Sequence, residues 1–372
     1  MAPSTCDVAL CYGTRPQVIK ASAIRAELSR RCQVLTVDTG QHYDYTLQAV
    51  HYEQLAIAPP DLFLEVGSGS HAEQTAAVLT RVETVLAERR PRAVVVIGGA
   101  NSTLGSALAA AKLRIPVVHV EAGLRTRDDG LPEEVNRRAV TAVAKVLCTP
   151  SASATRRVRA ERPDAIVVET GDVAFDVLLK QAGHLPDPAG LLPAGVASPY
   201  VFATLHRPEL TDNRDLLFEV LVSLNQLGRP VIIPVHPRTF ETLENAGSEL
   251  RRLTSLHFME AVGYRDSLAL IRSAESVVTD SGGVQREAYW FGVPCVTVRS
   301  ETEWEELVAC GANRLVPPAE SERLPRVVTE QLQRWGGSER WTNDAYGTGH
   351  AARSVAAAAT GLVAGAAAAD GD

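Results

Sequence analysis

The chain lacks the long apolar run that a membrane-spanning helix requires, although 45% of its residues are hydrophobic. No segment approaches the roughly 20 consecutive apolar residues that cross a bilayer as a helix. The N-terminus also lacks a basic segment followed by an apolar stretch, so no secretion signal is predicted. We therefore expect a cytoplasmic protein without membrane contact.

An excess of positive charge is also missing. The chain has 44 acidic and 37 basic residues, which gives a formal net charge of −7. Binding to nucleic acid depends on clustered cations, so this composition argues against a nucleic-acid partner. The six cysteines include no C-x-x-C pair, which argues against a zinc site or a redox motif. We expect reduced thiols within the core.

Strand and helix signals alternate along the chain. Short apolar segments such as 8–11, 93–97 and 117–120 are separated by longer helical patterns. This succession predicts a mostly parallel sheet with helices on both faces. The alternation restarts after a stretch rich in Pro, Gly and Ala at 183–199, so we expect two doubly wound α/β halves with a cleft between them. We expect the last dozen residues to be frayed or disordered.

Two strand-to-helix turns have the composition of an anion site. In TDSGGVQREA, Ser281, Gly282 and Gly283 would bring backbone N–H groups close to a phosphate at the start of a helix. Glu287, one turn later, could accept hydrogen bonds from a ribose diol. The alternative is an ordinary tight turn followed by a solvated charge.

The second turn is GTRPQVIK at 13–20. Its Arg15 and Lys20 could neutralise a diphosphate, or they could be ordinary surface charges.

Acids and histidines follow several of the predicted strands. Glu121 ends the strand at 117–120, and Glu133 and Arg137 follow after a loop. Because open α/β sheets bind ligands at the carboxyl ends of their strands, these residues are candidates for a site. His206 and His236 end strands of the second half; the first suits proton transfer or contact with a phosphate oxygen.

Taken in order, these motifs resemble the non-hydrolysing UDP-N-acetylglucosamine 2-epimerase family. GTRPQVIK resembles the family string GTRPE-x-IK, and HVEAGLRT and LPEEVNR are close matches to two of its most specific strings. TGQHYDYTL lies between the first two of these strings, and TGD, LHR, TDSGGVQREA, VRSETEWEELV and AYGTGHAA follow in that order after LPEEVNR. The resemblance implies the GT-B fold, in which two Rossmann-like domains close on a nucleotide sugar.

The resemblance also implies a domain plan. We expect an N-terminal domain with the catalytic carboxylates at 1–175 and a UDP-binding C-terminal domain at 176–350. At 351–372 we expect the start of a helix that packs back on the first domain, followed by an Ala/Gly-rich tail. We also expect a homodimer. The Ala-rich, Arg-rich composition suggests a bacterial source, and a specialised pathway such as antibiotic or polysaccharide biosynthesis is compatible with it.

The implied activity is inversion of C2 in UDP-N-acetylglucosamine or a related UDP-sugar. The family eliminates UDP to form a glycal and then adds UDP back, without a redox cofactor or a metal. The resemblance assigns catalytic roles to Glu121, Glu133 and His206. It assigns ligand-binding roles to the remaining matched positions, which are Arg15, Lys20, Arg137, Ser281, Gly282, Gly283 and Glu287; we add His236 as a ligand-binding candidate from its place after a strand.

Gly99 departs from the family pattern, because an aspartate counted among the catalytic acids stands there in the family. Glycine cannot transfer a proton, and losing a positioned acid or base costs about 10²–10⁴ in rate. Three functions stay open: an epimerase with a reduced set of groups, a GT-B glycosyltransferase with room for an acceptor, and a non-catalytic nucleotide-sugar binder. If the family geometry is kept, Gly99→Asp should raise the epimerase rate. Gln17 also replaces a family glutamate.

Overall fold

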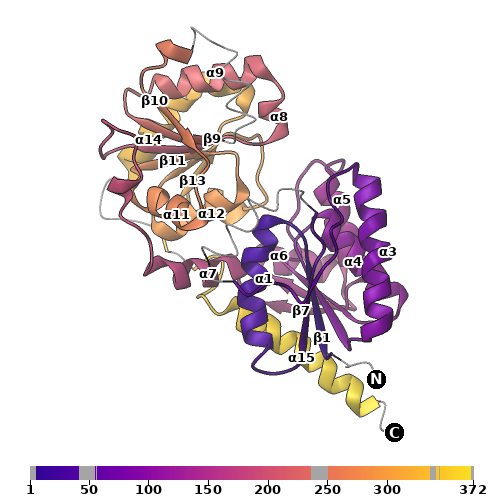
Figure 1. Cartoon of the computed structure of the whole chain (residues 1–372). Coiled ribbons are helices and arrows are strands. Elements are labelled where there is room, and N and C mark those ends of the chain that lie inside the picture. The colour runs from indigo at the N-terminus through magenta and orange to yellow at the C-terminus, as the bar shows by residue number, and fades with distance from the viewer. Residues whose placement is uncertain are drawn as a thin grey trace. The chain divides into compact units, whose positions relative to one another are not determined.

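The computed structural model describes residues 6–41, 55, 57–235, 250–335, 341–342 and 344–369. The chain divides into two units. Unit 1 comprises Met1–Lys180 and Asp344–Asp372, and unit 2 comprises Gln181–Asn343. Each unit is built on one parallel sheet covered by helices (Figure 1), which confirms the predicted class of two doubly wound α/β folds.

Unit 1 contains a sheet with the strand order β3-β2-β1-β4-β5-β6-β7. Its strands are β1 (Val8–Tyr12), β2 (Val34–Asp38), β3 (Leu62–Phe63), β4 (Ala93–Ile97), β5 (Val117–Val120), β6 (Val146–Thr149) and β7 (Ile166–Glu169). Its helices are α1 (Arg15–Leu28), α3 (His71–Arg89), α4 (Asn101–Lys112), α5 (Pro132–Val143), α6 (Ala152–Glu161), α7 (Val173–Ala182) and α15 (Ala351–Ala369).

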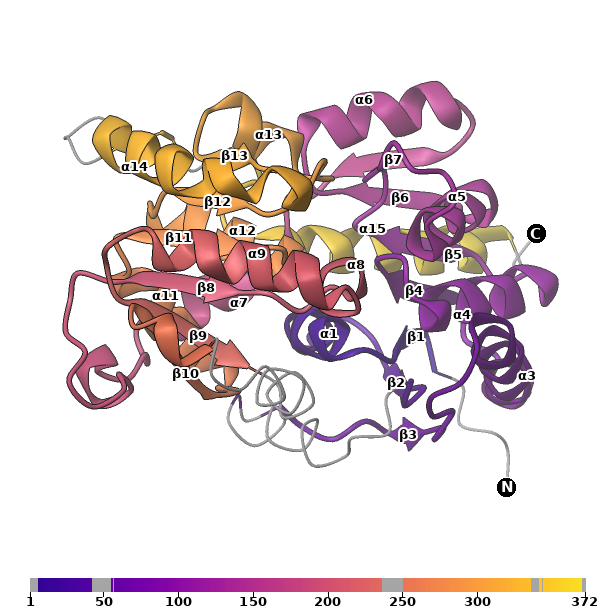
Figure 2. The ribbon, with the colours of Figure 1, turned by 90° about the horizontal axis from the view of Figure 1, so that it is seen from above.

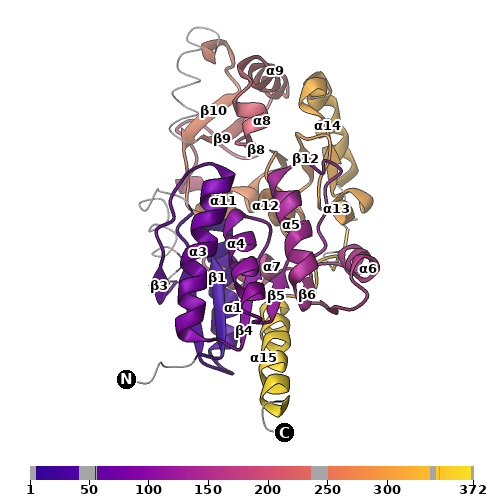
Figure 3. The same cartoon turned by 90° about the vertical axis from the view of Figure 1, so that its right-hand side faces the viewer.

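The central strands of unit 1 are buried on both faces, because successive side chains of a strand point to opposite sides of the sheet. Val8 and Leu10 of β1 pack in one apolar cluster with α1 and α15. Ala9 and Cys11 pack in another cluster with α3 and α4. Figure 3 shows α3, α4 and α5 side by side over that second face.

The C-terminal helix α15 is longer than we expected. It runs to Ala369 instead of fraying over the last dozen residues, which agrees with alanine's helix propensity, the highest of any residue. Asp176 of α7 accepts hydrogen bonds from the backbone N–H groups of Ala351 at 3.0 Å and Ala352 at 2.8 Å. A carboxylate at this position satisfies N–H groups that have no partner within the helix.

Unit 2 contains a sheet with the strand order β10-β9-β8-β11-β12-β13. Its strands are β8 (Val201–Thr204), β9 (Val231–Val235), β10 (Leu256–Glu260), β11 (Ser276–Thr279), β12 (Cys295–Thr297) and β13 (Asn313–Leu315). Its helices are α8 (Pro208–Thr211), α9 (Arg214–Asn225), α11 (Tyr264–Ser273), α12 (Gly282–Phe291), α13 (Glu305–Ala309) and α14 (Leu324–Trp335), with short 3₁₀ turns at Pro188–Gly190, Leu250–Arg252 and Pro318–Arg323.

The sheet of unit 2 is also covered on both faces (Figure 2). Val201 and Ala203 of β8 pack with α9 and α14, whereas Phe202 packs with α11 and α12. None of the helices in the described ranges is long and apolar enough to cross a membrane.

The strand order reverses once in each sheet. In unit 1 the reversal lies between β1 and β4, and in unit 2 it lies between β8 and β11. Open α/β sheets bind ligands at the carboxyl ends of the strands beside such a reversal. Several candidate residues lie there: Arg15 and Lys20 follow β1, Gly99 follows β4, His206 follows β8 and Ser281 follows β11.

Candidate active site

Glu121 and Lys20 meet at the carboxyl edge of the unit 1 sheet. Lys20 Nζ lies 2.6 Å from Glu121 Oε1, and each side chain is only 8% exposed. Glu121 directly follows β5, and Lys20 comes from the second turn of α1. The ammonium group of Lys20 is therefore directed at a candidate catalytic carboxylate. Arg15 lies at the exposed first residue of the same helix.

The backbone of Glu121 is strained. Its φ is 63°, in the left-handed region, which costs a non-glycine residue on the order of 1 kcal/mol. The next residue, Ala122, is fixed by a hydrogen bond from its N–H to the carbonyl of Cys148 at 3.0 Å. A Cβ placed on Gly98 would lie 3.3 Å from Glu121 Oε2, so glycine there leaves space beside the carboxylate. Strain of this kind clusters at functional sites.

Gln17 joins the turn after β1 to the turn after β4. Its Oε1 accepts hydrogen bonds from the backbone N–H groups of Gly13 (2.9 Å) and Thr14 (3.1 Å). Its Nε2 donates to the carbonyl of Ile97 at 2.6 Å and to Thr103 Oγ1 at 2.8 Å. A carboxylate cannot donate to a carbonyl, so the amide fits this network better than the family's glutamate does.

His119 supports the glycine turn from inside the core. It is fully buried on β5, with Nε2 2.8 Å from the carbonyl oxygen of Gly98. Burial lowers the pKa of His119 to about 4, so the ring is neutral at neutral pH.

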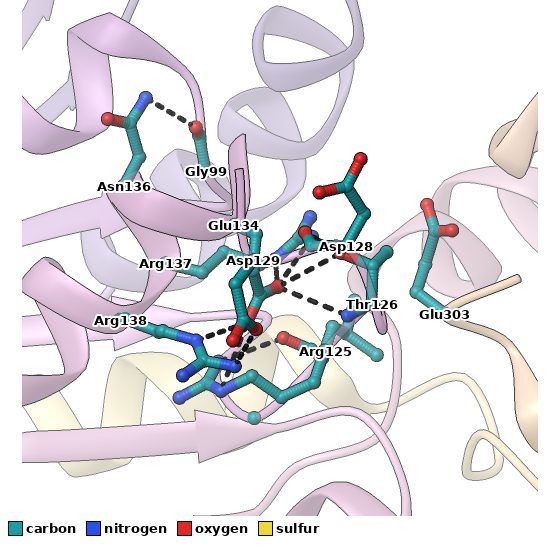
Figure 4. Close-up of polar contacts among 12 residues, drawn as sticks. Gly99, Arg125, Thr126, Asp128, Asp129, Glu134, Asn136, Arg137, Arg138 and Glu303 are labelled. Carbon is teal, nitrogen blue, oxygen red and sulfur yellow. Dashed lines mark hydrogen bonds and ion pairs between the residues drawn. The ribbon is translucent and has the colours of Figure 1, made fainter. Parts of the chain in front are cut away.

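Gly99 is tightly enclosed by the first two turns of α5. A Cβ there would lie 2.8 Å from Arg137 Cγ and 2.9 Å from the carbonyl oxygen of Glu133. Asn136 Nδ2 donates to the Gly99 carbonyl at 2.9 Å (Figure 4). A side chain at position 99 would therefore require these atoms to move, and the higher rate expected for Gly99→Asp stays a prediction.

The start of α5 presents two glutamates in different environments. Glu133 is exposed beside Gly99, whereas Glu134 is fully buried. Arg137 donates to Glu134 Oε2 through Nε at 3.0 Å and Nη2 at 2.8 Å (Figure 4). Our sequence analysis did not single out Glu134. The sequence signal that could have identified Glu134 is its spacing of three residues from Arg137 and four from Arg138, which places the three side chains on one face of a helix.

His206 in unit 2 is oriented by Asp280, another residue that we did not single out. His206 Nδ1 lies 3.0 Å from Asp280 Oδ1. The other carboxylate oxygen accepts from the backbone N–H groups of His206 (2.8 Å) and Arg207 (2.9 Å). Burial acts to raise the pKa of Asp280, but the bonds from His206 and Arg207 outweigh it and lower the pKa. With Nδ1 engaged, Nε2 is the ring nitrogen that a ligand can use.

The glycine turn of unit 2 forms the start of α12. Thr279 Oγ1 accepts a hydrogen bond from the N–H of Ser281 at 2.9 Å, which fixes the turn. A Cβ on Gly283 would have only Ser281 Oγ nearby, at 3.7 Å, whereas one on Gly282 would lie 3.0 Å from Trp304 Nε1. Glu287 follows on the same helix and is partly buried. His236 lies outside the described residues.

In the part of the chain that the structure describes, no group of three or more His, Cys, Asp or Glu side chains could hold a metal ion.

The chain is similar to known proteins of one family. The family model described as UDP-N-acetylglucosamine 2-epimerase matches residues 26–360. UDP-2,3-diacetamido-2,3-dideoxy-D-glucuronate 2-epimerase of Pseudomonas aeruginosa is 39% identical over 342 residues, which cover 88% of this chain and 95% of that protein. UDP-N-acetylglucosamine 2-epimerase of Methanocaldococcus jannaschii is 34% identical over 360 residues, covering 94% and 97%.

The solved structures lead to the same family. The crystal structure of the Methanocaldococcus jannaschii UDP-GlcNAc 2-epimerase in complex with UDP-GlcNAc and UDP has a TM-score of 0.83 and 33% identity. The match covers 95% of this chain and 99% of that one. A family model that matches nine-tenths of the chain and relatives of this similarity leave one assignment: the chain is a member of the UDP-N-acetylglucosamine 2-epimerase family.

Proposed function

We propose that this chain inverts C2 of UDP-N-acetylglucosamine or a related UDP-sugar. The observation that carries the proposal is the buried Lys20–Glu121 pair at the carboxyl edge of the unit 1 sheet. It places a carboxylate where α/β folds bind ligands, in a chain whose relatives are named 2-epimerases. The Pseudomonas relative adds an oxidised, diacetamido UDP-sugar as a second candidate substrate.

The chemistry explains why carboxylates are needed. The C2–H bond of the sugar is weakly acidic, and direct removal of the proton would leave a carbanion that nothing stabilises. Loss of the proton to a base, together with cleavage of the C1–O bond, gives a C1=C2 double bond, and UDP leaves with the electron pair. In the return step a UDP oxygen attacks C1, and an acid protonates C2 on the other face. We assign Glu121 and Glu133 as the acid–base pair of these steps.

The residues of unit 2 suit the leaving group. The backbone N–H groups at Ser281, Gly282 and Gly283 begin a helix, where an anion is favoured by the helix dipole. We assign these groups to the diphosphate, Glu287 to the ribose and His206 Nε2 to the leaving oxygen. Hydrogen-bond donors held in place around a developing charge usually lower the activation barrier more than any other single effect. Arg15 and Arg137 of unit 1 supply further positive charge.

Exchange of the C2 hydrogen with solvent tests this proposal. The protein is incubated in D₂O with UDP-N-acetylglucosamine and, separately, with UDP-2,3-diacetamido-2,3-dideoxy-D-glucuronate, and the C2–H signal is followed by NMR. An epimerase places deuterium at C2 and yields the C2 epimer without any acceptor. Release of UDP only on addition of an acceptor would indicate a transferase, and stabilisation by UDP without either reaction would indicate a binding protein.

A matched pair of variants locates the chemistry. Glu121→Gln should lower the exchange rate by about 10²–10⁴ while UDP affinity stays within a few fold. Glu169→Gln is the control, because Glu169 ends β7 of the same sheet and accepts a hydrogen bond from Thr155 Oγ1 at 2.9 Å. It should leave the rate unchanged. Equal rates for Glu121→Gln and wild type would contradict the assignment of Glu121.

We also propose a cytoplasmic homodimer. The family resemblance supports the dimer, and α5 exposes apolar side chains, with Val135 50% and Val143 36% exposed.

A further inference from the structure

We propose that Glu134 is a positioning residue, which fixes the Arg137 guanidinium and the segment between Glu121 and Glu133. The inference rests on the proposed function, because it deepens the account of the unit 1 carboxylates.

Glu134 binds three arginines from a position with no solvent exposure. Its Oε2 accepts from Arg137 Nε (3.0 Å) and Nη2 (2.8 Å), and its Oε1 accepts from Arg138 Nε (2.9 Å). Arg125 Nε lies 3.6 Å from Oε1. Figure 4 shows these side chains converging on the carboxylate. A buried carboxylate without such partners would be strongly unfavourable, so the three arginines stabilise the charged form of Glu134.

Arg137 is held at both ends of its side chain. Its Cγ packs against Gly99, where a Cβ would come within 2.8 Å, and two of its nitrogens bind Glu134. Among the hydrogen bonds of the described residues, none uses Arg137 Nη1. The cluster thus leaves one guanidinium nitrogen as the donor for a ligand and sets its direction.

The same carboxylate connects the segments that bear Glu121 and Glu133. Glu134 Oε2 also accepts a hydrogen bond from the backbone N–H of Thr126 at 3.2 Å. Thr126 belongs to the loop that leads from Glu121 to α5, and Glu133 lies in the first turn of that helix. A change at Glu134 therefore acts on both segments at once.

Glu161 provides a matched control within this cluster. It pairs with Arg125 through Nη2–Oε2 at 2.5 Å and Nε–Oε1 at 3.2 Å, and its side chain is 38% exposed. No hydrogen bond or ion pair of the described residues joins Glu161 to Arg137. Glu161→Gln makes the same chemical change as Glu134→Gln and should leave the exchange rate within about twofold, since a partly exposed ion pair contributes little.

Glu134→Gln keeps the shape of the side chain and removes its charge. We expect kcat for C2 exchange to fall roughly 10- to 100-fold, because a misplacement on the order of 1 Å costs this much, while KM changes less. Glu134→Asp keeps the charge but places the carboxylate farther from Arg137, so it should lower kcat by a similar factor. This variant replaces Glu134→Gln in the test if the glutamine variant does not fold. A rate equal to wild type in either folded variant overturns the proposal.

A double-mutant cycle separates positioning from general stability. Because Glu134 acts in part through Arg137, Glu134→Gln should lower kcat by a smaller factor in the Arg137→Gln variant than in the wild type. Independent, multiplicative losses would overturn the proposal. The cycle is also run on the Kd for the UDP-sugar, measured by calorimetry. If the wild type does not exchange its C2 hydrogen, the proposed function is refuted but the inference about Glu134 is not. In that case, coupling between positions 134 and 137 in the Kd would support the inference. Absence of coupling in the Kd would refute the inference.

Discussion

At the scale of single residues, the packing around Gly99 bears on why glycine replaces the family's aspartate at this position. The sequence predicts a lost acid, whereas the structure shows a position filled by its neighbours. Arg137 Cγ and the Glu133 carbonyl oxygen occupy the space that any side chain would enter. One of these atoms belongs to the backbone, so relief requires movement of the first turn of α5.

Gly99→Ala should therefore destabilise unit 1 by about 1–3 kcal/mol and lower the exchange rate, since an added methyl overpacks the site. Urea unfolding and the D₂O assay measure the two effects. Gly183→Ala is the control, because a Cβ there would meet no atom within 4 Å. It should change stability by less than about 0.5 kcal/mol. An increase in exchange rate for Gly99→Asp would contradict this account and confirm the expectation from the family pattern.

The two adjacent glutamates of α5 have different environments that the sequence alone could not predict. The motif LPEEVNR marks Glu133 and Glu134 equally from composition, and the family resemblance selects the first. Neighbouring side chains on a helix point about 100° apart, so only one of the two can face the arginine cluster. Which one does so depends on how α5 docks on the sheet, and this is a tertiary property. Asp280 is a similar case, since its role depends on β11 lying beside β8.

At the scale of elements, the strongly apolar strands were the predictable ones. The predicted segments 93–97 and 117–120 coincide with β4 and β5, because both are apolar and bounded by turn residues. Our sequence analysis missed β10, whose sequence LHFME mixes polar and apolar residues, and it missed β3 and β13, which have only two and three residues. Strands this short carry no periodicity, and only pairing with a neighbour defines them.

The docking of α15 offers a test at this scale. Asp176→Ala removes the carboxylate that caps the Ala351 and Ala352 N–H groups. Loss of a cap costs about 0.5–2 kcal/mol, so the unfolding free energy of unit 1 should fall by this amount. Hydrogen exchange at the first turn of α15 should increase. Asp187→Ala is the control, because Asp187 caps only the short turn Pro188–Gly190. If the two substitutions lower the unfolding free energy equally, the capping of α15 makes no specific contribution to the stability of unit 1.

At the scale of the whole molecule, acid acts unequally on the two units. The pKa of His119, in unit 1, is lowered from 6.5 to about 4 by burial. Between these values the unfolded chain binds a proton that the folded chain does not, so folding stability falls as the pH falls. From pH 7 to pH 5 the loss should be about 2 kcal/mol. The pKa values of Glu134 and Asp280 are lowered from 4.5 and 3.8, so their contributions are lost only in stronger acid.

The tryptophans allow this difference to be measured in the intact chain. All four, Trp290, Trp304, Trp335 and Trp341, belong to unit 2. Tryptophan fluorescence therefore reports the unfolding of unit 2, and far-UV circular dichroism reports both units. On going from pH 7 to pH 5, the urea midpoint from circular dichroism should fall more than the midpoint from fluorescence. His119→Gln should remove most of the difference, and the exposed His184→Gln should keep it. Identical shifts of both midpoints in the wild type would mean that the two units unfold together in one cooperative transition. The loss of stability caused by protonation of His119 would then apply to the whole chain.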